Sequence, residues 1–304
     1  MLRQQFNNYV KIGAACLMVC LLMIFCSACG NGAVDDNGGL SDVLLKYSIT
    51  VVDGTQETKY TFAEMLKWED AQFKGIYSVI NNWPTKRFDV AQGIKLSAVL
   101  EYAGVLDKAR VITVIAGDGY SCSFTKEQLL ADRYYFPGLL EGSAAGAMPL
   151  EIILAYCYAE SSADMEKLYE SKRNSPVLIY GQTNPVYQNS AGFVVNIDKI
   201  IISAAEPEKW AAPSTYPLSG SVSKGDTVKI EHKDLLGGFA KIYYTLDGSD
   251  PSEENGYLYN PSTYQPELLV PIAVNGDLTI KAVVVGPGKY DSDIKTFKFT
   301  VRQT

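Results

Sequence analysis

The most informative local pattern in this chain is residues 93–124, GIKLSAVLEYAGVLDKARVITVIAGDGYSCSF. Its first half predicts a helix, because the apolar residues fall on one stripe and Gly104 can end the helix in the left-handed conformation. The β-branched run 110–116 predicts a strand covered on both faces. After the Gly-Asp-Gly turn, Cys122 shares one face of the next strand with aromatic neighbours. The stretch therefore predicts a helix, a strand, a turn and a second strand.

Short strands and helices surround this unit between residues 44 and 205. Thr61 and Thr125 each open a capping-box pattern, in which a Thr hydroxyl and an acidic or amide side chain three residues later satisfy free amides at a helix start. We expect the first of these helices to end at Gly75. The other expected elements are an exposed helix at 163–173 and strands at 45–52, 150–158, 176–181 and 193–203. Because there is no regular βαβ period, the pattern predicts an α+β domain.

The N-terminus has the form of an export signal. Arg3 and Lys11 flank an apolar run that is too short for an ordinary membrane-spanning helix. Residues 26–30, CSACG, place small residues before Cys29 and resemble a bacterial lipobox, although a cysteine stands where leucine is usual. We expect residues 1–28 to be a lipoprotein signal peptide and Cys29 to carry the lipid. Residues 29–43 are then a flexible tether to the outer face of the cytoplasmic membrane.

Charge and cysteine content limit the possible partners. The full chain has a net charge of −7, which becomes about −9 when Arg3 and Lys11 leave with the signal. Such an acidic chain is a poor ligand for nucleic acid, which is bound by clustered Lys and Arg. Only Cys122 and Cys157 remain in the folded part, and they can be either a disulfide or two buried thiols. The sequence leaves the oligomeric state open.

A second domain is expected at 217–304, after a Pro-punctuated linker at 206–216. Every segment beyond the linker has the composition of a short strand followed by a turn, as in an all-β immunoglobulin-like sandwich. The expected strands are 222–230, 241–246, 268–272, 278–285 and 294–301.

Residues 75–203 resemble the sulfite-oxidase-type molybdopterin-binding domain. The resemblance is carried by Gly93-Ile94-Lys95-Leu96-Ser97, by Asp118-Gly119-Tyr120-Ser121 and by Leu154-Ala155-Tyr156. It implies a mixed α+β fold in which a cysteine thiolate binds molybdenum. That cysteine belongs upstream of the Gly-x-x-Leu-Ser helix, where this chain has Asn81-Asn82. Asparagine cannot replace a thiolate at a soft-metal site. We therefore expect a scaffold without a cofactor.

Residues 217–304 resemble the C-terminal domain of chitobiase/β-hexosaminidase. The run YYTLDGSDPS at 243–252 carries most of the likeness, together with TIKA at 279–282 and YDSD at 290–293. In that family this domain is an accessory β-sandwich outside the catalytic part. Through WPTKRF at 83–88 and GQTN at 181–184, the first domain also resembles the version found in surface lipoproteins of Gram-positive bacteria. Together these resemblances imply an extracellular protein, associated with glycan or cell wall, without hydrolase activity.

The candidate ligand pocket consists of Trp83, Lys86, Arg87, Asp118 and Tyr120, which we expect to line one concave site. A lone Lys-Arg pair is more often a solvated turn, so the two readings of residues 86–87 stay open. The only histidine, His232, is expected on a surface strand, and no Gly-x-Ser-x-Gly nucleophile motif is present. The favoured hypothesis is an extracellular binding module.

The alternative is an exported molybdopterin-dependent oxidoreductase in which Cys122 takes over as metal ligand. It would require stoichiometric molybdenum in the purified protein, so elemental analysis separates the two hypotheses.

Overall fold

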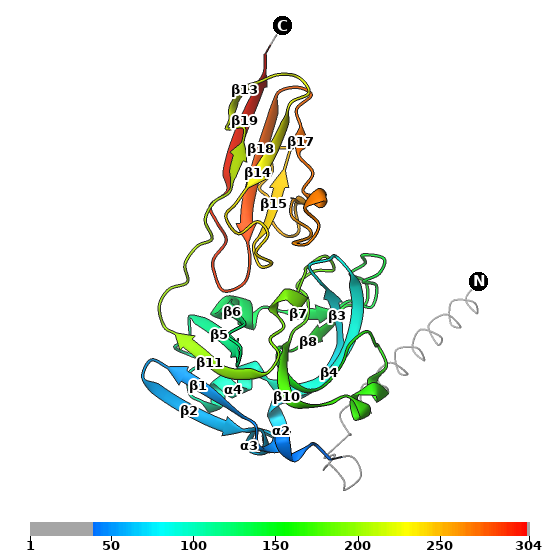
Figure 1. The fold of residues 1–304 in the computed structure, drawn as a ribbon, viewed down its shortest axis with the longest axis vertical. Coiled ribbons are helices and arrows are strands. Elements are labelled where there is room, and N and C mark those ends of the chain that lie inside the picture. Colours follow the sequence, from blue (N-terminus) through cyan, green and yellow to red (C-terminus); the bar gives the residue numbers. More distant parts are fainter. Residues whose placement is uncertain (1–38, 303–304) are drawn as a thin grey trace, which may run out of the picture. The chain divides into compact units, whose positions relative to one another are not determined.

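The computed structural model describes residues 39–302 (Figure 1), and from Ser41 onward the chain forms one compact unit. The signal segment, Cys29 and most of the predicted tether lie outside the described residues. Within residues 39–302, no helix is both long enough and apolar enough to span a membrane. The described residues are mostly β, arranged in several sheets, and the helices are short.

The first segment of the fold, residues 41–203, builds two main sheets. One has the strand order β2-β1-β11-β5-β6 and the other the order β10-β9-β4-β3, while β7 and β8 form a separate pair. The helices and 3-10 turns are α2 (Asp42–Lys46), α3 (Phe62–Met65), η1 (Glu69–Ala71), α4 (Leu96–Tyr102), α5 (Lys126–Leu130), η2 (Met165–Glu170) and η3 (Ser190–Gly192). The strands are β1 (Ser48–Asp53), β2 (Gln56–Thr61), β3 (Gln72–Ile80), β4 (Lys86–Lys95), β5 (Val111–Ala116), β6 (Ser121–Thr125), β7 (Arg133–Tyr135), β8 (Met148–Leu150), β9 (Ile153–Ala159), β10 (Lys172–Ile179) and β11 (Ile197–Ser203).

The helix, strand, turn and strand predicted at 93–124 are present as α4, β5 and β6. Gly104 has a φ of +66° directly after α4, as expected of a helix-ending glycine. Both predicted capping boxes form, at Thr61 with Glu64 and at Thr125 with Gln128. The prediction that β5 is covered on both faces is wrong, because its residues alternate between buried and half-buried.

Three further predictions for the first segment are corrected by the structure. The helix opened by Thr61 ends at Met65, and Gly75 lies inside β3, where it pairs with Ala91. The charged segment 163–173 forms only the 3-10 turn η2, since β10 already begins at Lys172. The predicted tether extends two residues too far, because Ser41 accepts a hydrogen bond from the amide of Leu44 and caps α2.

Gly93 lies where two strands approach each other too closely for a side chain. It pairs with Ala155 of β9 at an irregularity in the β4–β9 register. A Cβ atom at this position would lie 2.4 Å from the carbonyl oxygen of Leu154 and 2.7 Å from the Cα of Ala155. Because backbone atoms surround it, no side-chain movement can relieve the overlap.

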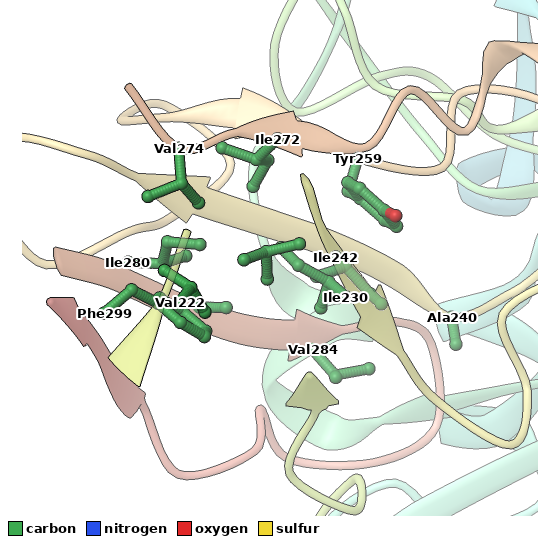
Figure 2. Packing of buried hydrophobic residues seen from close by; sticks show 12 residues of the cluster. Val222, Ile230, Ala240, Ile242, Tyr259, Ile272, Val274, Ile280, Val284 and Phe299 are labelled. Carbon is green, nitrogen blue, oxygen red and sulfur yellow. The ribbon is translucent and has the colours of Figure 1, made fainter. Parts of the chain in front are cut away.

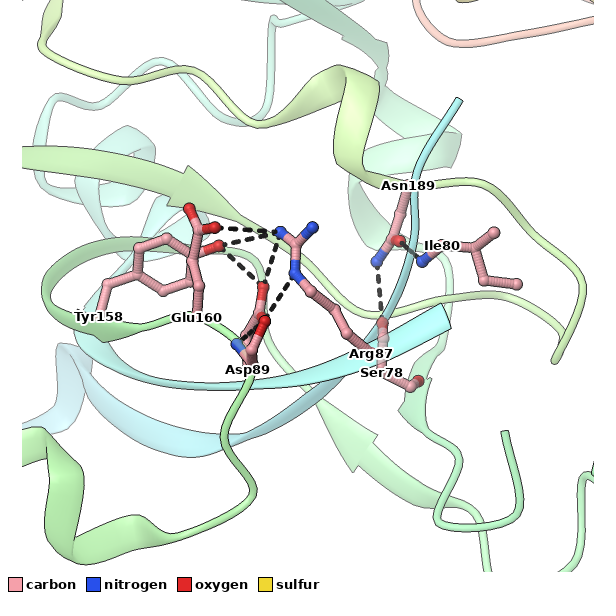
Figure 3. Close-up of polar contacts among 8 residues, drawn as sticks. Ser78, Ile80, Arg87, Asp89, Tyr158, Glu160 and Asn189 are labelled. Carbon is pink, nitrogen blue, oxygen red and sulfur yellow. Dashed lines mark hydrogen bonds and ion pairs between the residues drawn. The ribbon is translucent and has the colours of Figure 1, made fainter. Parts of the chain in front are cut away.

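One buried amide ties the loop at 181–189 to the sheets. Asn189 is fully buried, and its Nδ2 donates to the carbonyl oxygens of Ser78, at 3.1 Å, and Tyr180, at 2.8 Å. Its Oδ1 accepts from the amide of Ile80 at 3.1 Å. Figure 3 shows this amide between Ser78 and Ile80. The bonds fix the end of the loop against β3 and β10.

The second segment of the fold, residues 214–302, forms a sandwich of two sheets. One is three-stranded, β12-β14-β17, and the other is five-stranded, β13-β19-β18-β15-β16. Twelve buried residues make its core (Figure 2), from Val222 to Phe299. The elements are β12 (Ser214–Tyr216), β13 (Gly220–Val222), β14 (Thr227–Glu231), β15 (Lys241–Thr245), β16 (Tyr257–Leu258), η4 (Pro266–Leu268), β17 (Ile272–Ala273), β18 (Leu278–Val285) and β19 (Lys295–Val301).

Four predictions for this segment differ from the structure. The predicted strand 222–230 is two strands, β13 and β14, separated by residues 223–226. The end of the predicted linker is strand β12, which pairs with β14. The predicted strand 268–272 is mostly coil after η4, because Pro266 initiates a 3-10 turn there. His232 lies just past β14, where its Nδ1 accepts from the amide of Asp234 and its ring packs edge-on to Trp210.

We expect Gly93→Ala to lower the free energy of unfolding by more than about 2 kcal/mol, because the added methyl group meets backbone atoms of β9. Gly117→Ala is the matched control, since a Cβ there meets nothing within 4 Å and its φ is not positive. Its effect should stay within about 0.5 kcal/mol. Urea denaturation of both variants measures the difference, and similar effects would contradict the close approach.

Candidate functional site

The five residues of the predicted pocket lie on two turns and one strand. Trp83 is in the turn between β3 and β4, Lys86 and Arg87 begin β4, and Asp118 and Tyr120 form the turn between β5 and β6. None of the five lines either of the two cavities described below. Among the described residues, the only hydrogen bond within the set runs from the Tyr120 amide to Asp118 Oδ1, at 2.9 Å.

Arg87 neutralises a buried carboxylate (Figure 3). Its Nε lies 2.8 Å from Oδ1 of Asp89, whose side chain is fully buried. Asp89 also accepts from the hydroxyl of Tyr158 and the amide of Ser161. Burial alone would lower the pKa of Arg87, but the hydrogen bond and charge of Asp89 outweigh it and raise the pKa. Arg87 is therefore held in a structural ion pair with a buried carboxylate. Its surroundings are neither those of a solvated turn nor those of a ligand pocket.

Lys86 and Asp118 also make local contacts. The Nζ of Lys86 donates to the carbonyl oxygen of Leu139 at 2.9 Å. Asp118 is exposed and closes its own turn through the bond to Tyr120. Both interactions hold the polypeptide backbone in place, at Leu139 and in the turn at 118–120. The structure thus leaves Trp83 and Tyr120 as the members of the predicted set whose rings are available at the surface.

Trp83 and Tyr120 belong to a surface aromatic strip, defined here as Trp83, Tyr120, Phe239 and Tyr264. The rings of Trp83 and Tyr264 stack with centroids 5.4 Å apart and planes 27° apart. Tyr120 and Phe239 lie 6.4 Å apart. Trp83, Tyr120 and Tyr264 are 53%, 46% and 65% exposed, and Phe239 is half-buried. Burial raises the pKa of Tyr120, with smaller contributions from Cys122 and then Tyr264, so this pair of phenols is also close.

Hydrogen bonds made by the side chain of Asn81 and the backbone of Asn82 hold the strip in place. Asn81 Oδ1 accepts from the amides of Trp83 and Thr85, each at 2.9 Å, which closes a tight turn and presents Trp83 outward. The carbonyl oxygen of Asn82 accepts from the amide of Thr263 at 3.3 Å. Trp83 and Tyr264 therefore follow two residues that are bonded to each other, although they are far apart in the sequence.

Sequence reasoning missed Phe239 and Tyr264. Tyr264 lies in a loop bounded by Pro261 and Pro266, and Phe239 follows Gly237-Gly238. Aromatic residues in loops rich in Pro and Gly are a weak signal, because loops lie at the surface and often carry binding residues. The pairing with Trp83 and Tyr120 has no signal in a single sequence.

The residues of the first segment do not fit a thiolate-bound molybdenum. Cys122 is 2% exposed. Burial, partly offset by hydrogen bonding to Tyr180 and by the charge of Arg133, raises its pKa to about 12. The thiol donates to the carbonyl oxygen of Ser123 from this buried position, so it is not presented to a bound metal. Asn81 and Asn82, at the position where the family ligand is expected, are bonded within the protein. No group of three or more His, Cys, Asp or Glu side chains in residues 39–302 is arranged to hold a metal. Cys157 is buried too, and both thiols are free.

Two cavities lie in the described part of the chain, and Phe239 of the strip lines the smaller one. One, of about 20 Å³, is lined by both segments and includes Lys241 and Glu253. The other, of about 230 Å³, lies between the end of α5 and β8, with Asp132, Glu151 and Ser97 on its walls. The smaller cavity has room for about one water molecule. The larger one combines two carboxylates with leucine side chains.

Comparisons with known proteins give weak likenesses. A family model described as Fn3 associated matches residues 232–299, and no curated protein matches the sequence. Among solved structures, the chain is similar to the sulfane dehydrogenase SoxCD from Paracoccus pantotrophus, with a TM-score of 0.33 and 10% identity over 83% of this chain and 70% of that one. It is also similar to fibronectin(III)-like modules of Clostridium thermocellum CbhA, with a TM-score of 0.19 and 11% identity over 75% of this chain and 94% of that one. TM-scores this low carry no argument about function.

We expect Arg87→Met to lower the free energy of unfolding by about 3 kcal/mol, because it leaves the buried carboxylate of Asp89 without a cation. Lys167→Met is the control. It removes an exposed ion pair with Glu170 and should cost less than about 0.5 kcal/mol. Thermal or urea unfolding of the two variants makes the comparison, and equal losses would show that Asp89 does not depend on Arg87.

Proposed function

We propose that the chain is a lipid-anchored protein of the bacterial cell surface that binds an extracellular glycan or cell-wall polysaccharide without catalysing a reaction. The observation that carries the proposal is the exposed Trp83–Tyr264 pair, extended by Tyr120 and Phe239. Exposed aromatic rings grouped on a surface are common at binding sites, because they offer a large apolar area at little cost in conformational entropy.

A sugar suits this surface better than a charged ligand. The C–H faces of a pyranose ring are apolar and stack on aromatic rings, while its hydroxyls bond to neighbouring neutral groups. The residues next to the strip in sequence are of this neutral kind, namely Asn82, Thr263 and Gln265. The acidic net charge, −7 over the whole chain, disfavours polyanions such as nucleic acid.

The cellular location and the domain architecture of the protein are part of the same proposal. The sequence of residues 1–28 and the lipobox-like segment at Cys29 support export and attachment to the outer face of the cytoplasmic membrane. The first segment is proposed to be a sulfite-oxidase-like α+β scaffold without its cofactor. The second is proposed to be an accessory immunoglobulin-like sandwich of the chitobiase C-terminal type, in line with the Fn3-associated match at 232–299.

We expect Trp83→Ala and Tyr264→Ala each to weaken glycan binding by at least tenfold, because each removes one ring of the stacked pair. The measurement is a glycan array with the protein lacking residues 1–38, followed by titration calorimetry with any glycan that binds. Tyr169→Ala is the matched control, since Tyr169 is 74% exposed and lies outside the strip. An array with no bound glycan, or equal losses in all three variants, would refute the proposal.

The lipid anchor has a separate test. In cells grown with a labelled fatty acid, the full chain should carry the label and remain with the membrane fraction. Cys29→Ser should abolish both, whereas Cys26→Ser, three residues earlier, should change neither. Label retained in the Cys29 variant would place the modification elsewhere.

A further inference from the structure

Glu253 makes a contact that joins the two segments of the chain. It lies in the loop between β15 and β16, and its Oε2 accepts from the hydroxyl of Thr183 at 3.3 Å and from Nδ2 of Asn184 at 3.4 Å. Thr183 and Asn184 belong to the loop at 181–189, which Asn189 fixes to the first segment. The contact therefore links a fixed loop of one segment to a loop of the other.

No cation pairs with this carboxylate. Among the described residues, Glu253 forms no ion pair. The charged and titratable groups that act on it or share its cavity are Arg133, Tyr180, Tyr187, Lys241, Tyr243, Glu254 and Asp291. Both donors that reach the Glu253 carboxylate are neutral.

The nearby cations are occupied elsewhere. Arg133 donates to the carbonyl oxygens of Gly181 and Gln128, and its guanidinium stacks over Tyr180. Lys241 Nζ lies 3.4 Å from Asn82 Oδ1 and 3.5 Å from the carbonyl oxygen of Asn260. A partly buried carboxylate without a paired cation is costly to ionise.

We propose that Glu253 is a proton-dependent clasp: protonated, it holds the sandwich against the loop at 181–189, and its ionisation loosens that contact. The aromatic strip depends on the same contact, because Trp83 and Tyr120 come from one segment and Phe239 and Tyr264 from the other. The clasp rests on these contacts together with the burial of Glu253 away from any paired cation, whereas its effect on ligand binding rests on the proposed function.

The direction of the pH dependence follows from the environment of Glu253. Burial first, and then the charges of Glu254 and Asp291, raise the pKa of its carboxyl from 4.5 to about 7, although the bond from Thr183 acts in the opposite direction. Between pH 4.5 and 7 the docked state binds more protons than the separated state, so docking strengthens as the pH falls through this window. Above pH 7 this contribution is lost.

Lys241 does not oppose the effect in this window. Burial lowers its pKa from 10.5 to about 8, so it is charged in both states below pH 7. Its contribution strengthens docking only as the pH rises from about 8 toward 10.5. The change in docking strength between pH 4.5 and 7 therefore reports on carboxyl groups and not on Lys241.

Peptide-resolved hydrogen exchange of the protein tests the clasp. The amides of Thr263 and Gly288 donate across the contact, to the carbonyl oxygen of Asn82 and to Gln128 Oε1. After correction for intrinsic rates, their protection in the wild type should fall between pH 5 and 7.5, by up to roughly fiftyfold if docking supplies the whole rise in pKa. A peptide from the middle of β18 should not change, which excludes global unfolding.

The variants assign the effect to one carboxyl group. Glu253→Gln keeps a neutral acceptor and should remove most of the pH dependence, while Glu254→Gln removes a neighbouring negative charge and should keep the pH dependence but shift it to lower pH. A flat wild-type profile, or an unchanged slope in Glu253→Gln, would overturn the clasp. Glycan affinity measured at pH 5 and 7.5 is the second readout. If protection changes and affinity does not, the link to the strip is wrong while the clasp stands.

Discussion

The buried amide of Asn189 is the interaction on which the rest of the arrangement depends. It satisfies the carbonyl oxygens of Ser78 and Tyr180 and the amide of Ile80, which would otherwise be unpaired where the loop at 181–189 enters the core. Leaving such groups unpaired costs about 1–3 kcal/mol each. The amide thus makes one loop conformation much more favourable than the others, and that loop presents Thr183, Asn184 and Gln188 to the second segment.

Neutral amides dominate the contacts between the two segments. Gln188 donates to the carbonyl oxygen of Pro261. Gln128 completes the capping box of Thr125 and also bonds to the turn around Gly288. The backbone of Asn82 bonds to Thr263. Such bonds change little with pH, because none of these groups titrates. Glu253 and Lys241 are the exceptions in this part of the structure, and for this reason protonation can act on the contact without acting on the two cores.

The sequence predicted the parts of the fold whose signals are local. Both capping boxes, the helix ended by Gly104 and strand β18 fall where the pattern places them. The predictions that were wrong failed because tertiary contacts override the local pattern. Gly75 has the composition of a helix end, but β4 pairs with it and makes it part of β3. The charged run 163–173 has helical periodicity, yet β9 takes Lys172 into the sheet.

The candidate site was predictable only in part, for the same reason. An aromatic residue beside Asn-Asn and Pro is a surface residue by local rules, and Trp83 is exposed in the structure. Arg87 was chosen for its charge, and nothing in the sequence around it shows that its partner Asp89 is buried and bonded to Tyr158. Tyr264 reaches Trp83 only because the backbones of Asn82 and Thr263 meet. A pairing of residues so far apart depends on the docking of two segments, which a single sequence does not encode in any local pattern.

The turn at Asn81 and Asn82 serves both segments of the chain. Asn81 Oδ1 accepts from the amides of Trp83 and Thr85 and fixes the turn, while the backbone carbonyl and the side chain of Asn82 both face the sandwich. The side chain that meets the buried ammonium of Lys241 there is a neutral amide, so this part of the contact needs no second charge to be buried. The same two residues therefore present Trp83 at the surface and let the second segment pack against the turn, which places Tyr264 on Trp83.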